Sequence, residues 1–429
     1  MIIRNGIAMR KSCMSALAVA TMTMAANFTP VHAGTLSAEQ SLGKALFFDT
    51  SLSKNGTQAC GSCHSPSVAF TDPDKSNPTS KGDNPFLFGN RNTPTVAYAA
   101  YSPEFGFDAN EGLWVGGQFL DGRANGLQAQ AKGPFLNLVE MGNSSRAAVI
   151  LKLKNGSNAD AFKAVYGANI LDTPYKAYEK LATAIASYEK SSEVSPFTSK
   201  FDYVNKGQAT YTIGEARGLK LFNDPMKGNC AACHISTASD DGPPALFTDF
   251  TYDNIGIPKN YASGFLTDPS QFNPDGLNFI DLGLGGIVGD ESLYGAFKVS
   301  TLRNIALTGP YGHNGWFDSL EDVIDFYATR DVKPVCTSVM LSSSAAVAAG
   351  CWPAAEFADQ MNTDELGNLP LNKWEKISIA KFLGTLTDGY QPGGIPEPST
   401  WALMILGFGG IGARIRRRGR KLIHNGAKA

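Results

Sequence analysis

Hydrophobic side chains recur at helical spacing in two stretches of the chain. Along residues 175–188 and 374–386, apolar residues return every three or four positions, as in an amphipathic helix. The two stripes consist of Tyr175, Tyr178, Leu181, Ala182, Ile185 and Tyr188, and of Trp374, Ile377, Phe382, Leu383 and Leu386. Residues 65–92 and 238–288 are instead rich in Gly, Pro, Asn and Asp, which predicts long loops rather than sheet. The pattern indicates a mainly α protein with long loops.

Two further helical stretches are diverged copies of each other. Residues 43–49 and 218–224 carry Gly, Leu, Phe and Asp at the same offsets. Ser37 and Gln40 supply a capping box for the first of these helices, since each side chain can bond the backbone of the other. Each copy leads through a turn-rich linker to a cysteine. We therefore infer a duplication in which each half opens with its own helix.

Each half carries a C-x-x-C-H run, at residues 60–64 and 230–234. In such a run two thiols add to the vinyl groups of a haem, and the adjacent histidine ligates the iron. A redox dithiol does not need the trailing histidine, and a zinc site would need four ligands gathered from both runs. The sequence therefore predicts two covalently bound haem c groups, held by Cys60, Cys63, His64, Cys230, Cys233 and His234.

Both ends of the chain resemble sorting signals. Residues 1–33 have basic residues, an Ala/Met-rich apolar stretch and a small-residue cleavage site, which predicts a signal peptide; a retained anchor is the alternative. Within residues 391–429, a Pro-Glu-Pro run precedes an apolar segment and a basic cluster. This order of features resembles the PEP-CTERM sorting tail. That resemblance implies processing by an exosortase, and a simple C-terminal anchor is the alternative. The expected location is the periplasm or cell envelope, with membrane anchoring before the tail is processed.

Composition adds limits on partners and domains. The 37 basic and 39 acidic side chains nearly balance, so nothing indicates a nucleic-acid partner. The length leaves room for two or three domains, and we predict a first haem domain over residues 34–205 and a second over residues 206–390. Cys336 and Cys351 remain after the haem cysteines, and in an oxidising compartment they are expected to form a disulfide rather than two free thiols.

The histidine count limits the iron ligands. Of five histidines, only His64, His234 and His313 lie outside the two terminal signals. At most one haem can therefore have two histidine ligands, through His313. The other sixth ligand must be Met, Tyr or Lys, or be absent. An absent ligand leaves iron free to bind peroxide, which favours an enzyme over a simple electron carrier.

Several motifs together resemble a known family. The chain resembles the bacterial di-haem cytochrome c peroxidases and their methylamine-utilisation relative MauG over about residues 42–388. The resemblance implies a mainly α fold with two cytochrome c-like haem domains, and it also implies a homodimer. The motifs are Arg91-Asn92-Thr93-Pro94-Thr95, Asp121-Gly122-Arg123, Gln130-Ala131-Lys132-Gly133-Pro134 with Glu140-Met141, Thr301-Leu302-Arg303-Asn304 and Pro310-Tyr311-Gly312-His313-Asn314-Gly315.

The resemblance makes the first haem the peroxidatic one. It places Gln130 and Glu140 in the distal pocket, which Pro134 helps to shape. A carboxylate can move a proton between the two peroxide oxygens while an amide holds the peroxide in place. An exposed loop carboxylate is the alternative for Glu140. Many members carry a distal histidine in the loop after the first run, but residues 65–92 contain none, so an open first haem is expected.

The resemblance also indicates ligands for the second haem and for a metal ion. The far ligand is Met in ordinary members and Tyr in MauG, and here Tyr327 stands fourteen residues after His313. A phenolate stabilises higher oxidation states of iron. The alternative is a core tyrosine, with Met340 as ligand. A calcium ion is expected on Asn92, Thr308 and Pro310, since calcium takes oxygen ligands.

One residue departs from the family pattern. Members carry a tryptophan between the haems, in an aromatic-Trp-Asp-Gly-Arg run, whereas residues 119–123 read Phe-Leu-Asp-Gly-Arg. Leu120 cannot carry a hole, so electrons would need Trp114 or direct tunnelling. The favoured function is reduction of hydrogen peroxide with electrons from a small cytochrome or copper protein. The alternatives are MauG-like oxidation of a protein or organic substrate, and a non-enzymatic electron carrier.

Overall fold

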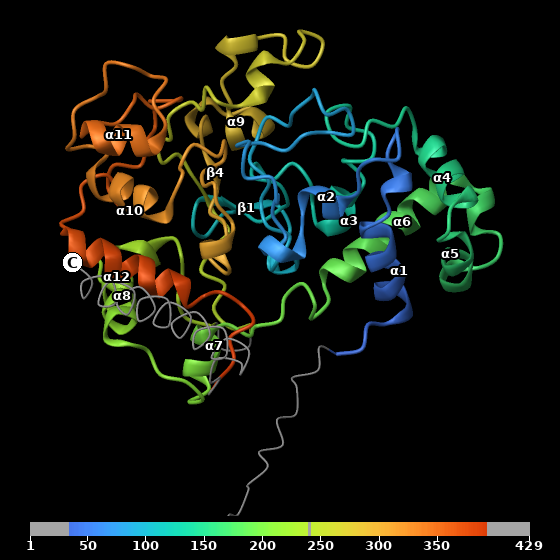
Figure 1. The fold of residues 1–429 in the computed structure, drawn as a ribbon, viewed down its shortest axis with the longest axis horizontal. Helices are drawn as coiled ribbons and strands as arrows, with labels where there is room; N and C mark the ends of the chain where they lie inside the picture. The colour runs from blue at the N-terminus through green and yellow to red at the C-terminus, as the bar shows by residue number, and fades with distance from the viewer. Residues whose placement is uncertain (1–33, 239–241, 393–429) are drawn as a thin grey trace, which may run out of the picture. The chain divides into compact units, whose positions relative to one another are not determined.

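Helices dominate the structure. A computed structural model describes residues 34–238 and 242–392 (Figure 1), so the predicted signal peptide and almost all of the predicted tail lie outside the described residues. The mainly α expectation is confirmed. The α-helices are α1 (Ala38–Phe47), α2 (Cys60–Cys63), α3 (Leu127–Ala131), α4 (Arg146–Asn155), α5 (Ala159–Tyr166), α6 (Pro174–Glu189), α7 (Lys200–Asn205), α8 (Ile213–Asn223), α9 (Gly283–Val288), α10 (Leu320–Thr329), α11 (Ser343–Ala349) and α12 (Lys373–Gly384).

Within the described residues, sheet is confined to two small antiparallel pairs. β1 (Gly106–Asp108) pairs with β2 (Leu113–Val115), and β3 (Tyr252–Asp253) pairs with β4 (Phe297–Lys298). The long segments expected as loops largely are loops, although α9 and β3 fall inside the second of them. β3 escapes prediction because its partner lies more than 40 residues further along the chain. Among the described helices, none is long and apolar enough to cross a membrane.

The first half is built on the packing of α1 against α6. The predicted capping box of Ser37 and Gln40 opens α1, and the predicted apolar stripe of α6 is buried from Tyr178 onward. Tyr175, in the first turn of α6, is instead 62% exposed, so its place in the stripe was wrong. Gly43 of α1 faces the carbonyl of Ala184, and a Cβ added there would collide with that oxygen. The close approach therefore requires glycine. Phe47 packs edge-on against Tyr188 across the same interface, with ring centroids 5.5 Å apart.

The second half repeats this helix pair. Gly218 of α8 lies against the carbonyl of Ser378 in α12, where a Cβ would again collide. Phe222 packs edge-on against Phe382, with centroids 5.3 Å apart. The duplication therefore extends from the first helix of each half to the helix that closes it. The described residues from Leu36 onward form one compact unit, so the division at residue 205 stays a prediction.

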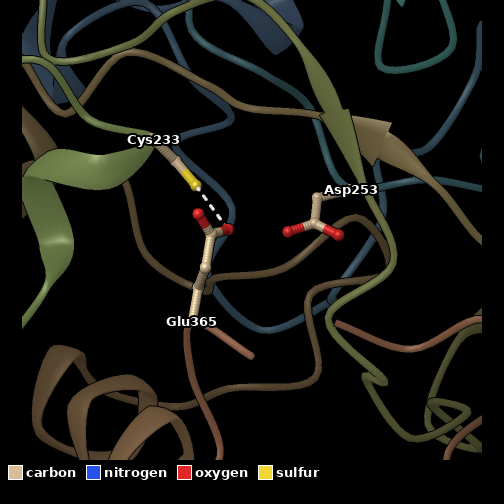
Figure 2. Close-up of side chains that lie close together, drawn as sticks. All are labelled: Cys233, Asp253 and Glu365. Carbon is tan, nitrogen blue, oxygen red and sulfur yellow. Dashed lines mark hydrogen bonds between the residues drawn. The ribbon is translucent and has the colours of Figure 1, made fainter. Parts of the chain in front are cut away.

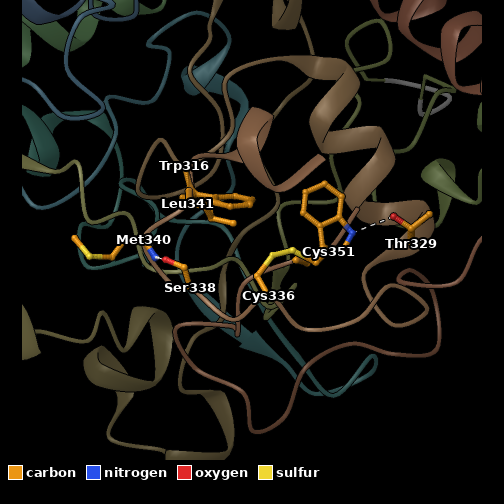
Figure 3. The surroundings of a disulfide bond; sticks show 8 residues. Trp316, Thr329, Cys336, Ser338, Met340, Leu341 and Cys351 are labelled. Atoms are coloured by element: carbon orange, nitrogen blue, oxygen red, sulfur yellow. Dashed lines mark hydrogen bonds between the residues drawn. A yellow bond between two sulfur atoms is a disulfide. The ribbon is translucent and has the colours of Figure 1, made fainter. Parts of the chain in front are cut away.

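The predicted disulfide between Cys336 and Cys351 is present (Figure 3). It closes the loop that carries α11, and Cys336 also donates its backbone N–H to the carbonyl of Trp352 at 2.9 Å. Trp352 in turn donates its indole N–H to the Thr329 hydroxyl at 3.0 Å. The hydrogen bond from Trp352 therefore ties the loop that the disulfide closes to Thr329, the last residue of α10.

Removing this disulfide should destabilise the protein. In the chain-entropy model, a cross-link across a sequence separation of 15 contributes about 3 kcal/mol, because it restricts the unfolded chain. We expect the double variant Cys336→Ser/Cys351→Ser to lose about this much unfolding free energy in urea denaturation of the holoprotein. A thiol reductant should lower the parent to the same level and leave the variant unchanged. A variant as stable as the parent would contradict the prediction.

Candidate functional site

The first C-x-x-C-H run forms a short helix that presents its histidine. α2 spans the two cysteines, and the backbone N–H of His64 donates to the carbonyl of Cys60 at 2.9 Å. The Nδ1 atom of His64 lies 3.0 Å from the carbonyl of Phe70, and burial lowers the pKa of the imidazole. A neutral ring that donates from Nδ1 leaves the Nε2 lone pair available for a metal. The geometry fits a haem iron ligand.

The second run repeats this arrangement. The backbone N–H of His234 donates to the carbonyl of Cys230 at 2.9 Å, and Nδ1 lies 2.8 Å from the carbonyl of Phe247. Burial again lowers the pKa of the imidazole. Phe247, like Phe70 in the first half, has positive φ (56° and 59°). This backbone conformation is costly for a bulky residue, and its repetition indicates that it is kept to aim the carbonyl at the histidine.

A pair of threonines supports both histidine sites. Thr95 donates its hydroxyl to the carbonyl of Ala69, next to Phe70, at 2.6 Å. Thr301 donates to the carbonyl of Leu246, next to Phe247, at the same distance. The two halves therefore hold their haem histidines with the same supports, which short sequence motifs did not reveal.

The duplication also relates Pro134 to Tyr327. In the first half, a β-bridge between Gln118 and Ala124 precedes α3. In the second half, a β-bridge between Tyr311 and Phe317 precedes α10 in the same way. Pro134 lies seven residues after the first residue of α3, and Tyr327 lies seven residues after the first residue of α10. The position that carries a tyrosine in the second half therefore carries a proline, which cannot ligate iron, in the first.

Tyr327 faces the second haem run. It lines a cavity of about 340 Å³ together with Cys230, Cys233 and His234. Burial raises the pKa of its phenol, and the nearby Cys233 and Asp253 act in the same direction. Met340, the alternative ligand, lies in the loop near the disulfide (Figure 3), is 71% exposed and does not line the cavity. These positions support Tyr327 over Met340.

His313 lines the same cavity but is engaged elsewhere. Its ring stacks on Phe297 with centroids 3.7 Å apart, and its Nε2 lies 3.4 Å from a carboxylate oxygen of Glu356. The Nδ1 atom is buried without a partner among the described residues. This arrangement favours a role at the wall of the haem cavity over ligation through Nε2.

Glu140 lies in the loop that follows α3. It is half-buried, and burial raises the pKa of its carboxyl group, an effect that the charge of Arg123 and the amide of Asn137 oppose. Burial raises the pKa of Cys63 to about 11, and Glu140 is among the carboxylates that add to this. The structure therefore places Glu140 near the first haem run.

The other two predicted pocket residues belong to the same segment. Gln130 lies in α3, and its backbone N–H bonds the carbonyl of Gly126 at 3.1 Å. Pro134 begins the following loop, where its carbonyl accepts from the N–H of Met141 at 3.1 Å. This bond closes the loop, so Gln130, Pro134 and Glu140 are carried by one short, internally bonded segment.

Two acidic residues that the sequence did not single out lie beside the second run (Figure 2). Asp253 and Glu365 approach Cys233, whose Sγ lies 3.7 Å from a Glu365 oxygen. Asn362 bridges them by donating its amide to Asp253 at 2.6 Å and to Glu365 at 2.8 Å. Attachment of haem would occupy the sulfur in a thioether, so the group is interpreted as an acidic rim of the second haem. No local signal could have found it, because β3 and the loop before α12 are distant in sequence.

The three predicted calcium residues come together. The side-chain nitrogen of Asn92 donates to the carbonyls of Pro310 and Pro78, each at 3.1 Å. Asn92, Thr308 and Pro310 line one small cavity, of about 10 Å³, with Asp72 and Asp74 at the same cavity. The carbonyl and carboxylate oxygens that these residues carry are of the kind that calcium binds.

Leu120 lies in the wall of the large cavity, beside a strand of the second half. It lines the large cavity, and its carbonyl accepts from the backbone N–H of Lys298 at 2.8 Å. The neighbouring Asp121 pairs with Arg91 at 2.5 Å, and Arg91 also pairs with Asp281 at 2.6 Å. These partners fix the loop in place but offer no redox-active ring at position 120.

Comparisons with known proteins agree with this geometry. The family model for di-haem cytochrome c peroxidase matches residues 37–210, and the PEP-CTERM protein-sorting motif matches residues 394–418. The methylamine utilization protein MauG of Paracoccus denitrificans is 38% identical over 359 residues, covering 82% of this chain and 89% of the relative. The cytochrome c551 peroxidase of Nitrosomonas europaea is 32% identical over 286 residues, covering 66% of this chain and 71% of the relative.

A solved structure gives the same answer for the fold. The diheme peroxidase BthA of Burkholderia thailandensis superposes with a TM-score of 0.69 at 30% identity, covering 85% of this chain and 89% of that one. The resemblance drawn from the motifs is thereby confirmed. The chain belongs to the di-haem cytochrome c peroxidase and MauG family.

Proposed function

We propose that this protein reduces hydrogen peroxide at the haem held by His64, with electrons from a small redox protein. The observation that carries the proposal is the asymmetry between the repeated halves. Both halves hold a histidine in the same way, but position 134 is a proline where position 327 is a tyrosine. A bound haem supplies iron that binds peroxide and stores oxidising equivalents. A haem held in the first half would therefore lack the tyrosine ligand that Tyr327 would offer in the second, and its iron would be open to peroxide.

The residues around the first site have distinct roles. The Phe70 carbonyl fixes the tautomer and orientation of His64. Glu140 takes a proton from the near peroxide oxygen and returns it to the leaving oxygen, while Gln130 holds the peroxide in place. The raised pKa of Glu140 suits both directions of transfer, because the group is then less biased towards the ionised form.

The second site acts as the redox partner. His234 and Tyr327 would hold the iron of the second haem, and an anionic oxygen donor stabilises oxidised iron. The carboxyl groups of Asp253 and Glu365 act in the same direction, because nearby negative charge favours the more positive oxidation state. This site would store one oxidising equivalent until the donor delivers an electron.

Stopped-flow absorption of the holoenzyme tests the function. Without donor, peroxide should change the spectra of both haems within one turnover, and a reduced small cytochrome should then restore them catalytically. Two low-spin ferric haems that do not respond to peroxide would contradict the proposal and favour an electron carrier. An altered substrate protein, found in place of cytochrome oxidation, would favour the MauG-like alternative.

That alternative rests on a particular observation. Tyr327, rather than a methionine, faces the second haem run, and the 38% identical relative is a MauG. Leu120 weighs against it, because a leucine between the haems cannot share a hole. We therefore place oxidation of a protein or organic substrate second. The PEP-CTERM motif supports export and sorting to the envelope, with exosortase processing of the tail; homodimer formation stays a prediction.

We also propose a calcium ion on Asn92, Thr308 and Pro310. Calorimetric titration of Ca²⁺ into chelator-treated holoenzyme should show one site, and Asn92→Ala should weaken it at least tenfold, because a side-chain oxygen ligand is lost. Asn84→Ala, at an exposed position of the preceding loop, is the control and should bind as the parent does. Equal binding by both variants would contradict the assignment.

A further inference from the structure

An aromatic series lies beside the loop that carries Leu120. The indole of Trp114, in β2, stacks on the ring of Phe105, with centroids 5.0 Å apart and planes 18° from parallel. Phe105 then meets the ring of Tyr252, in β3, edge-on at 6.2 Å. Trp114 and Tyr252, which belong to different halves of the chain, are thus joined by one bridging ring.

The inner end of this series is fastened to the wall of the second haem cavity. Tyr252 donates its hydroxyl to the carbonyl of Gly116 at 2.5 Å, and a Cβ added at Gly122 would collide with that hydroxyl. The backbone of Tyr252 pairs with Lys298, whose N–H donates to Leu120 at 2.8 Å. Leu120, Lys298 and the neighbouring Asp253 all line the cavity. The series therefore ends beside the loop that carries Leu120, the position of the missing tryptophan.

The outer end lies on an apolar and acidic surface. In the β1–β2 hairpin, Phe107 is 55% exposed and pairs across the strands with Trp114, which is in partial contact with solvent; the ring centroids lie 5.6 Å apart. Leu113, which precedes Trp114 in β2, is 47% exposed. Glu104, just before β1, and Glu111, in the turn between β1 and β2, are both exposed. Residues 101–115 contain no lysine or arginine. An apolar centre with a rim of one charge sign suits a partner of the opposite sign.

We propose that the β1–β2 hairpin docks a small basic redox protein and that Trp114 receives its electrons, with Phe105 and Tyr252 forming the packed path inward. This inference rests on the proposed function, because peroxide supplies the oxidising equivalents. In each transfer an oxidised haem centre gains one electron from the indole of Trp114, and the indole regains one from the donor. No covalent bond changes in the transfer. Two transfers, with two protons from solvent, balance the reduction of one peroxide to two waters.

The first test uses the holoenzyme with peroxide and a reduced, basic cytochrome c as donor. Trp114→Phe keeps an apolar ring for docking but is much harder to oxidise, so kcat should fall at least tenfold while KM stays within twofold. The matched control is Trp374→Phe in α12, which replaces another exposed indole (68%) and should behave as the parent. Equal kcat values for the two variants would overturn the proposal.

The second test addresses docking. Glu104→Gln/Glu111→Gln should raise KM for the basic cytochrome about fivefold at low salt and flatten its dependence on ionic strength. The control pair is Asp160→Asn/Asp172→Asn, which removes two acidic groups whose side chains are 96% and 63% exposed elsewhere. If both pairs shift KM equally, net charge alone explains the effect and the hairpin is not the docking surface.

A third measurement does not depend on turnover. When peroxide is added without donor, the indole that feeds the haems should be oxidised, so peptide mass spectrometry should find oxygenated Trp114 in preference to Trp374. If the parent haems do not respond to peroxide at all, the proposed function fails before this inference is reached. If they respond but Trp114 and Trp374 are modified equally, the proposed function survives and this electron path is wrong.

Discussion

Replacing Glu140 by glutamine should lower the rate of the reaction between peroxide and the holoenzyme about 100- to 1,000-fold. Glutamine has the same size and can still form hydrogen bonds, but it cannot take the first peroxide proton and return it to the leaving oxygen. Stopped-flow traces at increasing peroxide concentration would give the second-order rate constant. Glu291→Gln, at an exposed glutamate, is the control and should leave that rate unchanged. Unaltered resting haem spectra would show that both haems are still attached.

The same variant should change the dependence of the rate on pH. Because burial raises the pKa of Glu140 above its ordinary value of 4.5, the carboxylate is lost at a higher pH than in an exposed glutamate. The parent rate should therefore fall on acidification with an apparent pKa above 4.5. In Glu140→Gln this acid limb should disappear. If the variant keeps both the rate of the parent and its fall in rate at acidic pH, another group moves the proton.

The features that the sequence predicted correctly depend on residues close together in the chain. A capping box, a three- or four-residue apolar period and a C-x-x-C-H run each lie within one helix or turn, so their spacing alone carries the prediction. The disulfide between Cys336 and Cys351 also follows from a short count, once the haem cysteines are set aside. These elements are the most secure part of the prediction for that reason.

The parts that were missed depend on contacts between distant segments. Asp253 and Glu365 meet beside Cys233 only because β3 and the loop before α12 fold onto the same haem edge. The backbone carbonyls of Phe70 and Phe247 leave no signature in side-chain identity. The repeat could have been followed further, because Gly122 and Gly315 each stand five residues before the leucine that opens the next helix. That spacing would have aligned Pro134 with Tyr327.

Replacing Tyr327 by phenylalanine should alter the second haem alone. Loss of an anionic oxygen ligand removes a group that stabilises ferric iron, so the midpoint potential of this haem should rise by about 100 mV or more, within the wide range that axial ligands set. Spectroelectrochemical titration and EPR of the holoenzyme would resolve the two haems. Tyr311→Phe is the matched control, because that phenol lines the same cavity but donates to the carbonyl of Ile305 at 3.0 Å. No spectral change in Tyr327→Phe would exclude it as a ligand.

The repeat supplies the reciprocal experiment. If position 134 faces the first iron as position 327 faces the second, Pro134→Tyr should place a phenol where none is present, give the first haem a low-spin signal and slow its reaction with peroxide at least tenfold. Pro134→Ala, which opens the same space without adding a ligand, should keep the first haem reactive. A Pro134→Tyr variant that stays high-spin and reacts as Pro134→Ala does would show that the two positions are equivalent in sequence register but not in their approach to iron. In that case the open state of the first haem would need a cause other than the exchange of tyrosine for proline.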